Sequence, residues 1–206
     1  GTLSVTPATL TVTTETGSKQ YDGTPLTKPG EVTGYKNGET ADFTVTGTIT
    51  EVGGPVTNTY TLVFADQEGA SDTATAISTD YTISESLGTL TITQNETELK
   101  IVSSTQTFEY NGLAQHEYKY TVTFGDESYT VTVAEGETTA VVTLDNGDKV
   151  TITPASSAQI THVSETTVDN AYTAVVDHED QYKTVTREVG TLSVTPATLT
   201  VTTETG

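Results

Sequence analysis

The chain has 206 residues, with 28 acidic and eight basic side chains and a formal net charge of −20 at pH 7. This acidity argues against nucleic acid and anionic membranes as partners, and no apolar run is long enough to insert into a bilayer. Cysteine is absent, which excludes disulfide bridges and thiolate metal sites. Threonine accounts for about fifty residues, and with valine it favours strands, because branching at Cβ suits a pleated surface.

The sequence GTLSVTPATLTVTTETG occurs twice, as residues 1–17 and 190–206, and the two copies are identical at all 17 positions. The chain therefore repeats with a period of 189 residues (190 − 1). Such a period is typical of a long tandem array of which this chain is slightly more than one unit. The expected partners are then identical neighbouring repeats, joined end to end.

In chain order, residues 1–6 are predicted to be the closing strand of a preceding repeat, and residues 196–206 the opening strand of the next. Between them lie a first domain, residues 7–93, and a second, divergent domain, residues 94–195. The two domains share an ordered series of motifs. These are Tyr21-Asp22-Gly23 with Tyr110-Asn111-Gly112, Asn37-Gly38-Glu39 with Asn146-Gly147-Asp148, Asn58-Thr59-Tyr60 with Asn170-Ala171-Tyr172, and the late tyrosines Tyr81 and Tyr182.

Apolar and polar residues alternate with period two in both domains, which places one face of each strand on a core and the other in water. Asn-Gly pairs at residues 37–38, 111–112 and 146–147 predict tight hairpin turns. Residues 66–79 are the least patterned and predict a loop with room for one helical turn. The second domain carries an additional hairpin at about residues 118–133.

These patterns predict an all-β fold of two tandem β-sandwich domains of immunoglobulin-like type. The linkers are short: Pro7 follows the closing strand at the junction between repeats, and only residues 94–96 lie between the two domains. Proline fixes φ, so we expect the domains to form an elongated, semi-rigid rod. The alternative is a pair of β-grasp-like domains, which would require a helix that the periodicity does not show.

The shared motifs have a structural interpretation. Tyrosine buries its ring and keeps its hydroxyl at a polar edge, while Asp-Gly or Asn-Gly makes a tight turn. The later Asn-x-Tyr predicts a core tyrosine that ties down a loop. The predicted structural residues are Tyr21, Asp22, Gly23, Asn58 and Tyr60, and their counterparts Tyr110, Asn111, Gly112, Asn170 and Tyr172.

The strings KQYDGTPLT, VTGYKNGETADFTVTGTITEVG, NTYTL and GTLTIT resemble the YDG or MBG-type tandem repeats of bacterial cell-surface adhesins, chiefly Gram-positive. The resemblance covers nearly the whole first domain. The second domain is a weaker relative, because Asn111 replaces the aspartate. The resemblance implies an extracellular module attached to the cell surface or cell wall.

An enzyme is not expected. The three histidines, His116, His162 and His178, lie in different segments and lack metal-ligand spacing, and the serines show no nucleophile-elbow pattern. No cofactor is predicted other than calcium, which needs a cluster of hard oxygen ligands. The calcium candidates are Asp66, Asp145 and Asp148, although none belongs to a complete loop motif.

The resemblance to surface proteins also implies a further hypothesis, because proteins of this class sometimes carry an intramolecular isopeptide bond. The candidates are Lys100, which lies in the opening strand of the second domain, and Asn170, which lies in a late one. Lys100 is out of phase with the apolar Leu99 and Ile101, which counts against it.

The leading functional hypothesis is a structural spacer in the stalk of an extracellular surface fibre or adhesin, projecting a distal head. One alternative is a module that binds a host glycan or protein through an exposed aromatic cluster at Tyr118, Tyr120 and Tyr129. Another is a fibre subunit assembled by strand exchange, because the predicted terminal strands would be unpaired edges that fray or complete one another between copies.

Overall fold

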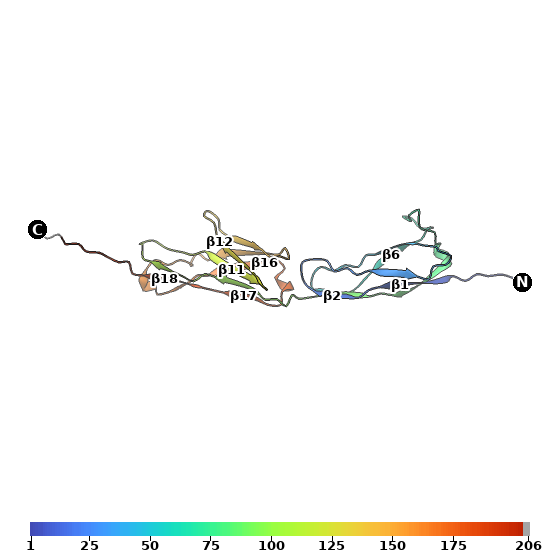
Figure 1. Ribbon diagram of the computed structural model, residues 1–206, viewed down its shortest axis with the longest axis horizontal. Coiled ribbons are helices and arrows are strands. Elements are labelled where there is room, and N and C mark those ends of the chain that lie inside the picture. The colour runs from blue at the N-terminus through green and yellow to red at the C-terminus, as the bar shows by residue number, and fades with distance from the viewer. Residues whose placement is uncertain (204–206) are drawn as a thin grey trace. The chain divides into compact units, whose positions relative to one another are not determined.

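The computed structural model describes residues 1–203 and divides the chain into two compact units, Gly1–Asn95 and Glu96–Gly206 (Figure 1). The division falls just after the position that the sequence indicated, between residues 93 and 94. Each unit consists of strands, and the predicted all-β class is confirmed. No helix within residues 1–203 is long and apolar enough to cross a membrane.

The first unit contains two three-stranded sheets and one two-stranded sheet, in the orders β3-β1-β7, β2-β8-β5 and β4-β6. Neighbours are antiparallel except β1 with β7 and β2 with β8, which are parallel. The strands are β1 (Ala8–Thr14), β2 (Gly17–Gln20), β3 (Gly30–Thr33), β4 (Asp42–Val45), β5 (Gly53–Thr57), β6 (Tyr60–Val63), β7 (Tyr81–Ser86) and β8 (Thr89–Thr93).

The second unit repeats this plan with the sheet orders β12-β11-β9-β17, β10-β18-β15 and β13-β14-β16. Among its strands within the described residues, again only two pairs are parallel, β9 with β17 and β10 with β18. The strands are β9 (Leu99–Ser103), β10 (Gln106–Glu109), β11 (Lys119–Phe124), β12 (Glu127–Thr132), β13 (Ala140–Thr143), β14 (Lys149–Pro154), β15 (Val168–Asp169), β16 (Tyr172–Val176), β17 (Val185–Glu188) and β18 (Thr191–Thr195).

The pairing pattern identifies the strands that the second unit has in addition. The strand β11 pairs with β9 as β3 pairs with β1, and β14 pairs with β16 as β4 pairs with β6. The additional strands are therefore β12 and β13, which widen two sheets by one strand each. The sequence placed the insertion at residues 118–133, but the first part of that range is β11, which has an equivalent in the first unit.

Alternation along the terminal strands produces the core. Leu10 and Val12 of β1 and Leu99 and Ile101 of β9 are fully buried, and so are Leu90 and Leu192 on β8 and β18. Leu10 packs with Phe64, Ala76 and Tyr81. The period-two pattern therefore identified the buried face of these strands correctly.

The Asn-Gly pairs do not all form hairpins. Only residues 146–147 join two paired strands, β13 and β14. Asn37 and Gly38 have positive φ, 50° and 75°, as a tight turn requires, but the flanking β3 and β4 belong to different sheets. The pair at residues 111–112 follows β10, whose partner is β18. The prediction of hairpins at these two places was wrong, because a turn sets only the local backbone and the core selects the strand partner.

Helical structure in the described residues consists of 3-10 turns of three residues each, at Ser78–Asp80, Val163–Glu165 and Glu179–Gln181. The first lies at the end of the loop predicted for residues 66–79. The helix that a β-grasp domain needs is not present among residues 1–203.

The two copies of the repeated sequence have different environments. Leu192 in β18 is 0% exposed, whereas Leu3, at the same place in the first copy, is 102% exposed. Leu10 in β1 is fully buried, whereas its counterpart Leu199 is 89% exposed. Residues 1–7 and 196–203 form no paired strand, and residues 204–206 of the predicted opening strand lie outside the described residues.

Because the two copies have the same sequence, the same substitution can be made at a buried and at an exposed position, which tests the assignment of the core. Leu192→Ala should lower the free energy of unfolding of the second unit by about 2–5 kcal/mol, because it opens a cavity in a packed core. Leu3→Ala makes the same chemical change in the same local sequence and should alter stability by less than about 0.5 kcal/mol. Urea denaturation of both variants measures the difference, and equal losses would contradict this assignment of the core.

Candidate functional site

The centre of each unit is a corner at which the two terminal chain segments pass from one sheet to another. In the first unit, β1 leads into β2 through Glu15 and Thr16, and β7 leads into β8 through Leu87 and Gly88. The two corners lie against each other, because a Cβ placed on Gly88 would be 2.3 Å from the carbonyl carbon of Glu15. Only glycine allows this approach.

Asn58 holds this corner together. Its side chain is fully buried, and its Nδ2 donates to the carbonyl oxygens of Glu15 and Lys28 at 3.0 and 3.1 Å. Its backbone N–H donates to the carbonyl of Gly88 at 2.9 Å, and its carbonyl accepts from the hydroxyl of Thr14 at 2.8 Å. One residue therefore satisfies backbone groups from three segments that cannot pair with a strand at the bend.

The second unit has the same arrangement around Asn170, which is also fully buried. Its Nδ2 donates to the carbonyls of Ser104 and Glu117 at 2.9 and 2.8 Å, and its backbone N–H donates to Gly190 at 2.8 Å. Ser103 takes the place of Thr14, and its hydroxyl accepts a bond from the backbone N–H of Gly190. The predicted asparagines are therefore structural residues in both units.

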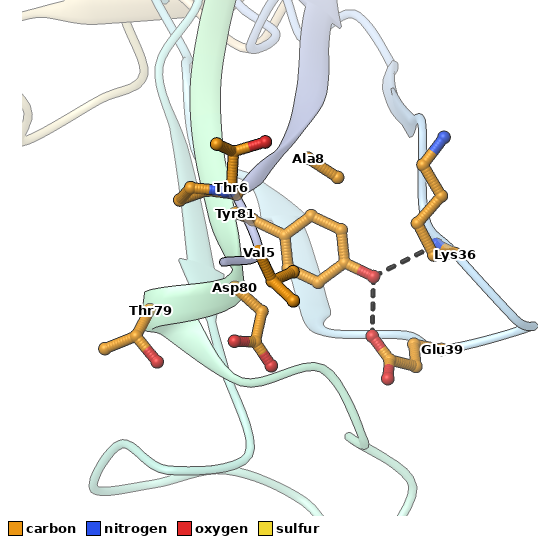
Figure 2. A pocket seen from close by; sticks show the side chains of 9 residues that line it. Val5, Thr6, Ala8, Lys36, Glu39, Thr79, Asp80 and Tyr81 are labelled. Carbon is orange, nitrogen blue, oxygen red and sulfur yellow. Dashed lines mark hydrogen bonds between the residues drawn. The ribbon is translucent and has the colours of Figure 1, made fainter. Parts of the chain in front are cut away.

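A second shared feature is a tyrosine at the start of the late strand. In the first unit, the hydroxyl of Tyr81 donates to Glu39 at 2.5 Å and accepts from the backbone N–H of Lys36 at 3.0 Å (Figure 2). The bond to Glu39 raises the pKa of Tyr81. This tyrosine ties the turn at residues 37–38 to β7.

In the second unit, the hydroxyl of Tyr182 donates to Asp148 at 2.5 Å and accepts from Asn146 Nδ2 at 2.6 Å. Asp148 is 4% exposed, and its other carboxylate oxygen lies 2.9 Å from Nδ1 of His178. Comparison of the two domains in the sequence aligned the turns that contain Glu39 and Asp148, but it did not predict that these acids bind the tyrosines. The signal that could have predicted these bonds is the acidic residue at the third position of both turns.

The Tyr-Asp-Gly motif of the first unit has the predicted geometry. Tyr21 is 3% exposed, and Gly23 has a φ of 75°. The carboxylate of Asp22 accepts from Lys19 Nζ at 2.6 Å and from the backbone N–H of Thr24 at 2.9 Å. The hydrogen bonds from Lys19 and then from the Thr24 hydroxyl lower the pKa of Asp22 to about 2.

The corresponding motif of the second unit differs from the prediction. Gly112 has a φ of 81°, but Tyr110 is 39% exposed and its ring does not belong to the core. The ring stacks instead on His162, with centroids 6.1 Å apart. Asn111 keeps the turn, because its Oδ1 accepts from the backbone N–H of Leu113 at 2.9 Å.

The later tyrosines of the two motifs use different partners. Tyr60 donates to Glu85 at 2.5 Å, and burial followed by this bond raises the pKa of Tyr60 to about 12. Tyr172 donates to the carbonyl of Ile101 at 2.7 Å. Tyr60 thereby joins β6 to β7, and Tyr172 joins β16 to β9, although neither ring is fully buried.

The three tyrosines Tyr118, Tyr120 and Tyr129 do not form one exposed cluster. Tyr120 is fully buried and meets Tyr172 edge-on at 5.3 Å. Tyr118 stacks on His116 at 4.1 Å, and Tyr129 donates to Asp145 at 2.8 Å. Tyr120 therefore belongs to the core.

Each calcium candidate is already bound by protein donors. Asp66 accepts from the hydroxyl and the backbone N–H of Ser78, at 2.6 and 2.9 Å, and these bonds lower the pKa of Asp66. Asp145 binds Tyr129, and Asp148 binds Tyr182. Within residues 1–203 there is no group of three or more histidine or acidic side chains that could hold a metal ion.

The structure does not bring Lys100 and Asn170 together. Lys100 Nζ lies 2.6 Å from Glu188, and this ion pair raises the pKa of Lys100. The amide of Asn170 is bound to the two carbonyls of the corner. The three histidines are also separate, since His116 stacks on Tyr118, His162 on Tyr110, and His178 contacts Asp148.

Comparisons of the chain with protein-family models, with curated proteins and with solved structures find no match.

The corner asparagines predict a shared effect on stability. Asn58→Ala and Asn170→Ala should each lower the free energy of unfolding of their own unit by about 2–4 kcal/mol, since each change removes the two hydrogen bonds of the side-chain amide and leaves two buried carbonyls without donors. Asn111→Ala is the control, because Asn111 is exposed, and should cost under about 1 kcal/mol. Denaturation curves of the three variants test this, and a loss for the corner variants as small as that of the control would contradict the role.

The turn at Asp22 predicts a pH effect with a defined sign. Because the folded-state pKa, about 2, lies below the ordinary 3.8, the carboxylate stabilises the fold above pH 3.8, and this contribution is lost as the pH falls towards 2. NMR titration of the Asp22 carboxyl should give a midpoint well below 3.8. Lys19→Ala should raise that midpoint, and an unchanged midpoint would contradict the turn geometry.

Proposed function

We propose that this chain is a spacer repeat in the stalk of an extracellular bacterial surface fibre or adhesin, attached to the cell surface and projecting a distal head. Each unit would be an immunoglobulin-like β-sandwich, and successive repeats would follow one another in a rod. Support comes from the exact 189-residue period, the repeated all-β plan and the resemblance of the first unit to YDG-type surface repeats.

The pairing of the terminal strands is the observation that carries the proposal. In the first unit, β1 and β2 at the start run parallel to β7 and β8 at the end. In the second, β9 and β10 run parallel to β17 and β18. Tension between the ends of a unit pulls two parallel strands in opposite directions along their length. All ladder hydrogen bonds are then loaded together, which resists force better than opening them one at a time.

Short connections also favour a spacer. The strand β8 ends at Thr93 and β9 begins at Leu99, while β18 ends at Thr195 and is followed by Pro196. Proline fixes φ and short linkers limit hinge motion. A stalk needs such junctions in order to hold its head away from the surface.

The alternative of a glycan- or protein-binding module has less support. It predicted an exposed aromatic cluster, and the burial of Tyr120 removes the central member. Strand exchange between separate chains needs no covalent repeat, so the exact period favours a tandem.

Single-molecule pulling tests the proposal. Stretching the chain from its two ends should give two unfolding events, each releasing roughly 300 Å of chain at ~3.3–3.6 Å per residue. A matched control attaches the handles through Lys119→Cys and Thr132→Cys, because these residues are partners at the open end of β11 and β12 and pulling there opens one bond at a time. The second unit should resist a several-fold lower force in the control. Equal forces in the two directions would contradict the proposal.

A further inference from the structure

We propose that two hollows at the ends of the repeat, one beside Tyr81 and one beside Tyr110, are the two faces of a single interface between successive copies of this chain. The inference rests on the proposed function in one respect, which is that the 189-residue unit recurs in tandem. It adds to that function the residues that would fix one repeat against the next.

The first hollow has a volume of about 350 Å³ and lies where the chain enters the first unit (Figure 2). Its fixed wall is the turn held by Tyr81 together with the 3-10 turn before β7. Its other wall is the entering segment itself. The lining residues of the fixed wall are Lys36, Glu39, Thr79, Asp80 and Tyr81, and those of the entering segment are Val5, Thr6, Pro7 and Ala8.

The second hollow, of about 440 Å³, lies where the chain leaves the second unit. Its wall is the stacked pair of Tyr110 and His162, continued by Val163 and Ser164 of the 3-10 turn. Val163 is 41% exposed and Tyr110 is 39% exposed, so both present apolar surface to solvent. The leaving segment, Pro196 and Ala197, completes the lining.

The two hollows share the same linker. Pro196 and Ala197 are the second copies of Pro7 and Ala8 within the identical 17-residue sequence. In a tandem array, residue 196 of one repeat is residue 7 of the next, so one Pro-Ala pair would line both hollows at once. The walls on either side of that pair then belong to successive repeats, and both border the same linker.

The burial of the repeated valine supports this geometry independently. Val5 lines the first hollow and is 97% exposed, whereas its second copy, Val194, is 6% exposed and packs with Ile160 and Leu192. In an array these are one residue. The segment that borders the first hollow would therefore be held by the core of the preceding unit, which places that unit beside the hollow.

Cysteine trapping tests the interface, because the chain contains no cysteine of its own. The protein is a tandem of residues 1–189 followed by residues 1–206, with Ser164→Cys in the first copy and Thr79→Cys in the second. A second pair, Ser164→Cys with Lys36→Cys, guards against a local effect of one substitution. In oxidised glutathione, both pairs should form an intramolecular disulfide at least tenfold faster than a control pair.

The control pair joins Ser164→Cys to Glu51→Cys. Glu51 is exposed and lies near Gly53, which pairs with Ile92 at the end of the first unit opposite Ala8. Circular dichroism of the reduced proteins checks that each variant is folded. Disulfide formation at the control rate in both test pairs would overturn the interface. If the unfolding force still depends on the pulling direction, that result would contradict the interface but not the spacer function. Conversely, rapid disulfide formation together with equal unfolding forces in the two directions would contradict the spacer function but not the interface.

Discussion

The fold of each unit depends on how two chain segments cross from one sheet to another at the same point. Backbone groups at such a bend cannot join a ladder, and leaving them unpaired in the interior would cost about 1–3 kcal/mol each. Asn58 and Asn170 supply the missing donors, while Gly88 and Gly190 leave room for the two corners to touch. Because the corners are fixed, the strands before and after them can each belong to a different sheet and still run parallel over the whole length of the unit.

The two units stabilise the same corner and the same turn with different side chains. A threonine at one corner corresponds to a serine at the other. Glu39, which accepts a hydrogen bond from the hydroxyl of Tyr81, corresponds to Asp148, which accepts one from Tyr182. The addition of β12 and β13 leaves this frame unchanged, because both strands pair outside it. What persists through the divergence is the parallel pairing of the terminal strands, on which the proposed spacer function rests.

The sequence predicted much of this fold because its signals were local and periodic. Alternation identified the buried faces of β1, β8, β9 and β18, and the paired motifs indicated the duplication. It could not predict which strands pair, and so two of the Asn-Gly turns were wrongly assigned to hairpins. It also predicted a buried Tyr110 by analogy with Tyr21, whereas the burial of a ring depends on its tertiary surroundings. The acids that bind Tyr81 and Tyr182 were overlooked because a turn was a sufficient explanation for them.

The proposed function requires that the repeats form a stiff array, in which each further repeat adds a fixed length. Small-angle scattering from proteins of one, two and three 189-residue repeats tests it most directly. We expect the maximum dimension to grow linearly with the number of repeats, and to be unchanged by calcium or by a chelator. Growth closer to the square root of the number of repeats, as for a flexible chain of beads, would contradict the account, and stiffening only in the presence of calcium would assign the junctions to a metal instead of to the protein's own contacts.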